Sequence, residues 1–189
     1  MLRLSALFAV DAFAGGFVVQ SFIAFWLARR FEVSTAATGA IFAGLGVLQT
    51  LSFLAASAIG ARLGLLRTMV VTHLPSNVFL AALAFAPNVA IAVALLSVRA
   101  LLGQMDVPTR QAYVMALVRP EERTAAAAMT GTARFIARPA APALGGLLAV
   151  TWLGAPFVVA GALKIAYDLT IWRWFRRVPL PDEDAARAP

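Results

Sequence analysis

Long apolar stretches alternate with short polar connections along most of the chain. Six of them can be delimited, at about residues 4–28, 36–59, 69–86, 88–118, 124–150 and 153–175. A membrane-spanning helix needs ~20 mostly apolar residues. The six stretches leave little room for a soluble domain, so the sequence predicts an all-α, polytopic membrane protein: a six-transmembrane-helix bundle over residues 1–178. We expect residues 179–189, which are polar and contain several prolines, to form a disordered cytoplasmic tail.

Composition agrees with a membrane location and narrows the function. The chain is 61% hydrophobic and 13% charged, whereas soluble domains have ~25% charged residues. It has no cysteine and one histidine, and we find no hydrolase or zinc-protease motif. We therefore expect a protein that is not an enzyme and that needs no cofactor and no metal. The net charge of +7 comes from dispersed residues and not from one basic patch, so we expect no nucleic-acid partner.

The distribution of arginines predicts an orientation. With a cytoplasmic N-terminus, eight arginines lie at the cytoplasmic ends of the expected spans, and only Arg29 and Arg30 lie at the opposite ends. The eight are Arg3, Arg62, Arg67, Arg119, Arg123, Arg173, Arg176 and Arg177. By the positive-inside rule, we expect a multi-pass protein of the cell inner (plasma) membrane with both termini in the cytoplasm.

Seven ionisable residues fall well inside the expected spans. Each would cost ~2.5–3.5 kcal/mol at the centre of a helix that faces lipid, so we expect them to face one another or a watery cavity. They are Asp11, Arg99, Asp106, Arg134, Arg138, Lys164 and Asp168. The first five are our candidates for a substrate pathway or a coupling site.

Other polar residues receive structural interpretations. Lys164 and Asp168 have opposite charges one helical turn apart, so we expect them to pair with each other. We interpret Arg110 as solvated near the cytoplasmic surface and His73 as a local structural residue. Prolines 75, 108, 139 and 142 predict kinks in the later helices.

Four short motifs resemble those of one family. The connection at residues 57–67 is similar to the cytoplasmic loop motif G-x-x-x-D-R-x-G-R-R-R of the major facilitator superfamily: Arg62, Gly64 and Arg67 match, while Ala61 stands in place of its aspartate. Arg99 and Gly103 resemble the R-x-x-x-G pattern that the family associates with proton coupling. Residues 119–123 resemble its P-E-E-R connection. Pro142, Gly145 and Gly146 resemble its G-P-x-x-G-G antiporter motif, which marks a kinked helix.

The resemblance covers the chain to about residue 178 and is greatest to the C-terminal six-helix half of an efflux-type bacterial permease. It implies a secondary active transporter of a small organic solute, with proton-coupled efflux. The implied partners are the lipid bilayer, a small-molecule substrate, protons, and a second six-helix half. That half is either part of the same longer protein, which we favour, or a separate chain. The alternative is a non-transporting membrane scaffold or subunit that pairs with another six-helix half.

Overall fold

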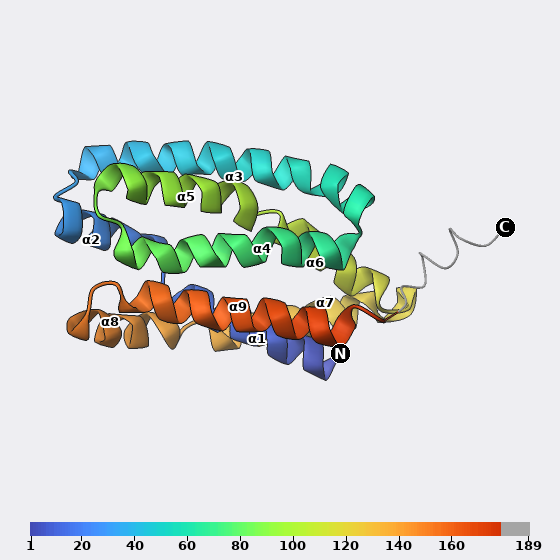
Figure 1. Ribbon diagram of the computed structural model, residues 1–189. Helices are drawn as coiled ribbons and strands as arrows, with labels where there is room; N and C mark the ends of the chain where they lie inside the picture. Colours follow the sequence, from blue (N-terminus) through green and yellow to red (C-terminus); the bar gives the residue numbers. More distant parts are fainter. Residues whose placement is uncertain (179–189) are drawn as a thin grey trace.

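The computed structural model describes residues 1–178, and these residues form a bundle of α-helices with no β-strand among them (Figure 1). The expected all-α fold class is confirmed. The expected tail at 179–189 lies outside the described residues.

The bundle contains both long helices and pairs of shorter ones. In chain order they are α1 (Leu2–Gly16), α2 (Gln20–Phe31), α3 (Thr35–Leu63), α4 (Leu65–Ala82), α5 (Val89–Gly103), α6 (Asp106–Ala116), α7 (Arg123–Ala137), α8 (Ala141–Thr151) and α9 (Ala155–Phe175). Short 3₁₀ turns follow α4 at Leu83–Phe85 and precede α7 at Pro120–Glu122. Helices α3, α4 and α9 correspond to single expected stretches, and the other three stretches are each divided in two.

Two of the interruptions lie side by side. Helix α1 ends after Gly15 and Gly16, and α7 ends just before Pro139, which cannot donate the next helical hydrogen bond. A Cβ atom on Gly16 would lie 2.6 Å from that of Ala141, and a Cβ atom on Gly145 would lie 3.0 Å from the carbonyl oxygen of Phe17. Glycine is therefore required at both positions for the α1–α2 and α7–α8 bends to touch. Pro75, by contrast, leaves α4 continuous.

Within residues 1–178, five helices or helix pairs are long and apolar enough to cross a membrane: Leu2–Phe31, Thr35–Leu63, Leu65–Phe85, Val89–Ala116 and Ala155–Phe175. The chain is therefore a polytopic membrane protein. Helices α7 and α8 have 15 and 11 residues, and each is short of the ~20 that a straight crossing needs. A sixth crossing by the two together stays a prediction.

Helices α4 and α9 pack against each other in the middle of the bundle (Figure 1). Helix α5 contacts α4 and is in turn covered by α3, while α1 contacts α9 and is covered by α7. Two separate apolar cores form along this axis. One surrounds Trp26, Leu80 and Phe157, and the other surrounds Phe8 and Met69.

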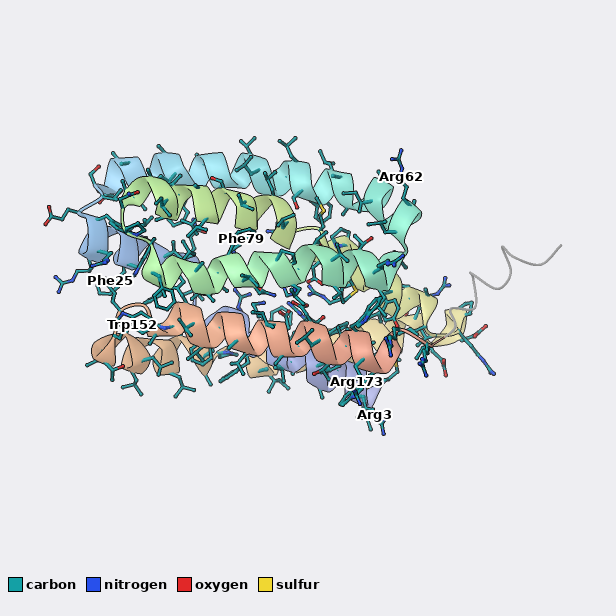
Figure 2. The ribbon with its side chains drawn as sticks, viewed as in Figure 1. Arg3, Phe25, Arg62, Phe79, Trp152 and Arg173 are labelled. Carbon is teal, nitrogen blue, oxygen red and sulfur yellow. The ribbon has the colours of Figure 1, made fainter. Side chains whose placement is uncertain are left out.

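Arginine side chains mark one end of the bundle. Arg3, Arg62 and Arg173 lie at the end where the chain begins, whereas Phe25 and Trp152 lie at the opposite end (Figure 2). Arg3 stacks over the ring of Trp174, 5.8 Å from its centroid. The gathering of these arginines at one end is the distribution from which the orientation is predicted, and which end faces the cytoplasm stays a prediction.

Candidate functional site

A layer of ionisable side chains, all buried except the partly exposed Arg134, separates the two apolar cores. Phe8 of α1 belongs to one core and Phe17, the residue directly after α1, belongs to the other, with the buried Asp11 between them in the chain. The same change from apolar to ionic to apolar occurs along α4 and α9, so nitrogen and oxygen atoms gather between these two helices in Figure 2. We call this set the ionic layer: Asp11, His73, Asp106, Arg110, Arg134, Lys164 and Asp168.

Asp11 is the centre of the layer, and three cations from three other helices surround its carboxylate. One oxygen accepts a hydrogen bond from Lys164 of α9. The other accepts one from Nη1 of Arg134 on α7, at 2.9 Å, and lies 3.5 Å from Nη1 of Arg110 on α6. Since Asp11 is only 2% exposed, its charge needs such partners to be tolerated.

His73 lies between two carboxylates. Its Nδ1 is 2.8 Å from Oδ1 of Asp168, and its Nε2 is 3.8 Å from Oδ1 of Asp11. Asn77, one turn along α4, donates to the other oxygen of Asp168 at 2.9 Å. His73 on α4 therefore lies between an acidic residue of α9 and an acidic residue of α1.

Asp106 begins α6 and pairs with Arg110 one turn further on. Beside this pair lies a cavity of about 160 Å³, the polar cavity, which is lined mainly by polar atoms of the ionic layer together with Gln49 and Arg99. Arg99 Nε and Asp106 Oδ1 have no hydrogen-bond partner in the described part of the chain. One donor and one acceptor are thus left for water or a ligand.

A second cavity, of about 440 Å³, lies between α1, α6 and α7, and we call it the lateral cavity. Arg110 and Arg134 line both cavities, so their side chains form the partition between them. The rest of the lateral cavity is largely apolar and includes Phe8, Val114 and Phe135.

The structure brings four of the five candidate pathway or coupling residues together. Asp11, Arg99, Asp106 and Arg134 all line the polar cavity. Arg138 does not reach it: this side chain is exposed at the α7–α8 connection, and its Cγ would lie 3.5 Å from a Cβ on Gly16. A role for any of the five in transport stays a prediction.

The cytoplasmic loop motif and the antiporter-like motif both occupy bends. Gly64 joins α3 to α4 with a φ of 84°, a conformation that favours glycine, and Arg62 and Arg67 are exposed on either side of it. Pro142 lies in the first turn of α8, where proline is tolerated. Gly145 faces the α1–α2 bend, whereas Gly146 borders a separate apolar groove against α2.

Three sequence interpretations are wrong. Lys164 pairs with Asp11, and Asp168 with His73 and Asn77, so the two residues do not pair with each other. Arg110 is 8% exposed and belongs to the ionic layer instead of the surface. His73 is 6% exposed and connects two carboxylates, which a purely local residue would not do.

Together, the helical membrane fold and its buried ionic layer are typical of a polytopic transport protein. Residues 4–188 match the family profile of the Major Facilitator Superfamily, and the chain belongs to this superfamily of membrane transporters. The expected family is thereby confirmed.

The chain is also similar to an uncharacterized membrane protein of Saccharomyces cerevisiae, with 23% identity over 173 residues. The match covers 90% of this chain and 39% of the yeast protein. The chain thus spans well under half the length of that relative.

Proposed function

We propose that this chain forms one six-helix half of a secondary active transporter that exports a small organic solute in exchange for protons. The observation that carries the proposal is the ionic layer. Five helices bring their charged or imidazole side chains to one depth beside a polar cavity. Buried charge at membrane depth is costly and typically marks an ion or substrate pathway.

Proton coupling is supported by the acidic members of the layer. Asp11 and Asp106 are the candidate coupling carboxylates, and both share the polar cavity with Arg99. The Arg99 charge stabilises a nearby ionised carboxylate, and any movement of Arg99 changes that effect. The export direction is supported by the resemblance of residues 141–146 to the antiporter motif.

A second six-helix half, in the same polypeptide or in a separate one, would complete the pathway. The proposal is supported by the yeast relative, of which this chain covers 39%. Helix α3 and the α7–α8 pair carry large exposed apolar side chains, which the second half or lipid can cover. Val47, Leu51 and Leu54 on α3, and Ile136, Leu147 and Val150 on α7 and α8, are each more than half exposed. With the arginine-rich end inside, both halves would lie in the inner (plasma) membrane with cytoplasmic termini.

Reconstitution of the chain together with its second six-helix half into liposomes that contain a pH-sensitive dye tests the proposal. Addition of an exported solute from a panel of small organic compounds should move protons across liposomes that contain the chain and not across empty ones. Arg99→Ala should abolish this movement while inserting as well as the parent. Arg173→Ala, at an exposed position on α9, is the control and should transport normally.

Two results would contradict the proposal at different levels. Proton movement that Arg99→Ala leaves unchanged would remove Arg99 from the mechanism. If no solute moves protons in liposomes in which this chain and its second half are both correctly inserted, the non-transporting scaffold becomes the better description.

A further inference from the structure

We propose that the lateral cavity binds an amphipathic organic anion, with the anionic group against Arg110 and Arg134 and the apolar body along Phe8, Val114, Met115 and Phe135. This inference rests on the proposed function and specifies its substrate class. The binding site itself can be tested without transport.

The shape and chemistry of the cavity point to a ligand with two different ends. The cavity of about 440 Å³ has mainly apolar side chains along its length. Its polar contribution includes the guanidinium groups of Arg110 and Arg134, which separate it from the polar cavity. A ligand that fills it therefore meets apolar surface on one side and cations at the partition.

The charge balance of the site favours an anion. Four cations, Arg99, Arg110, Arg134 and Lys164, line the polar cavity, against the two carboxylates Asp11 and Asp106. Asp168 is engaged by His73 and Asn77 on the far side. With Asp168 counted as a third carboxylate and His73 neutral, one positive charge is in excess around the partition, and an added anion would neutralise it.

Arg134 is the cation best placed to receive the ligand. Its side chain is 30% exposed, whereas those of Arg110 and Lys164 are 9% and 8% exposed. Its ion pair with Asp11 uses Nη1, and a guanidinium has five N–H donors. Arg134 can therefore hold Asp11 and a ligand oxyanion together, and the two bonds can fix the orientation of a planar carboxylate.

A cationic ligand would face the opposite balance. It would bring a further positive charge close to the guanidinium groups of Arg110 and Arg134. Like charges in contact repel strongly at low dielectric. A neutral ligand of the same shape would fill the apolar length but gain no charge-assisted hydrogen bond. The expected order of affinity is thus anion, then alcohol, then amine.

Three water-soluble probes with the same body test this order: 3-phenylpropanoate, 3-phenyl-1-propanol and 3-phenyl-1-propylamine. Titration calorimetry with the chain in phosphatidylcholine nanodiscs, corrected with empty discs, gives the affinities. We expect the propanoate to bind about tenfold or more tightly than the alcohol, with the amine weakest. Equal affinities for the three probes, or tighter binding of the amine, would overturn the proposal.

Two variants place the binding in the lateral cavity. Arg134→Gln should reduce propanoate binding about tenfold and remove the preference over the alcohol. Gly131→Leu should block all three probes, because a Cβ atom there meets nothing within 4 Å and the leucine would extend into the cavity. Gly39→Leu on α3, at an equally open position outside the cavity, is the matched control and should bind the propanoate like the parent.

An anionic bilayer lipid has the same chemistry as the proposed ligand. Repeating the titration in phosphatidylglycerol discs separates the two sources. Unchanged propanoate affinity supports a soluble solute, and strong competition would assign the cavity to lipid and overturn the substrate proposal. If the cavity binds anions but no solute moves protons, the binding site is supported and the proposed transport function is contradicted. If the protein transports solutes but the cavity shows no preference for anions, the transport function is supported and the anion site is contradicted.

Discussion

Asp11 and Lys164 form an ion pair between α1 and α9 although 153 residues separate them in the chain. Both side chains are less than 10% exposed, so neither charge can be satisfied by bulk water. The pair joins the N-terminal and C-terminal helices of the bundle at the level of the ionic layer.

Removing the charge of Asp11 should be strongly destabilising. Asp11→Asn leaves Lys164 and Arg134 without their shared carboxylate, and loss of one partner of a buried pair typically costs about 3–5 kcal/mol. Thermal unfolding of the detergent-solubilised protein should show a clearly lowered Tm. The double variant Asp11→Asn with Lys164→Met should recover part of the loss, because it removes an uncompensated cation. Glu121→Gln, at an exposed acid, is the control. If Asp11→Asn and Glu121→Gln lower the Tm equally, the central place of Asp11 in the ionic layer is refuted.

His73 should carry its proton on Nδ1 when neutral. When Asp168 is ionised its oxygens can only accept, so the 2.8 Å contact requires Nδ1 to donate to Asp168 and not to accept from Nδ2 of Asn77, which lies 3.1 Å away. The chain has one histidine, and ¹⁵N NMR of labelled protein would therefore give one unambiguous pair of imidazole signals. Asp168→Asn should weaken the preference for this tautomer. A neutral ring protonated at Nε2 in the parent protein would contradict the arrangement.

Gly16→Ala should destabilise the contact between the two helix bends. The new methyl group would lie 2.6 Å from the Ala141 Cβ and 2.8 Å from the Arg138 carbonyl oxygen, and overpacking of this kind costs about 1–3 kcal/mol. Gly44→Ala on α3 is the matched control, because its new Cβ has no neighbour within 4 Å. That variant should be neutral or more stable by up to ~1 kcal/mol. Unfolding curves of the Gly16→Ala and Gly44→Ala variants measure this difference. Similar stabilities of the two variants would show that the bends are not tightly packed.

Single cysteines can test the proposed orientation, since the parent chain has none to react. Thr124 and Thr151 are exposed near opposite ends of the α7–α8 pair. With cytoplasmic termini, Thr151→Cys should react with a membrane-impermeant maleimide in intact spheroplasts, and Thr124→Cys only after permeabilisation. The reverse pattern would invert the orientation, and labelling of both in intact spheroplasts would contradict a sixth crossing.

Much of the fold is predictable because length and hydropathy determine membrane helices directly. The cost of unpaired charge likewise predicts that Asp11, Asp106 and Arg134 lie inside the bundle. The partners are less predictable, because i,i+4 spacing brings Lys164 and Asp168 close enough to pair whether or not tertiary partners compete. Tertiary packing brings Asp11 to Lys164 and His73 to Asp168, so Lys164 and Asp168 do not pair with each other.

Depth along the helices would have been a better guide to partners than spacing within one helix. At 1.5 Å per residue, Asp11, His73, Asp106, Arg134 and Lys164 all lie ~12–17 Å from the arginine-rich ends of their helices. Residues at one depth on adjacent helices can meet, so this count would have included His73. Spacing alone would put Arg138 one turn beyond Arg134 on the same helix face. Helix α7 ends at Ala137, and the bend turns the next arginine outward.

The contact between the two bends also constrains how this molecule can move. Because Gly16 and Phe17 touch Ala141 and Gly145, a change in the angle between α1 and α2 must be accompanied by a change between α7 and α8. Helices α1, α2, α7 and α8 then move together, beside the uninterrupted helices α3, α4 and α9. Asp11 on α1 and Arg134 on α7 lie on the same side of the two bends. Their ion pair would therefore stay intact in such a movement, while its distance to Lys164 on α9 would change.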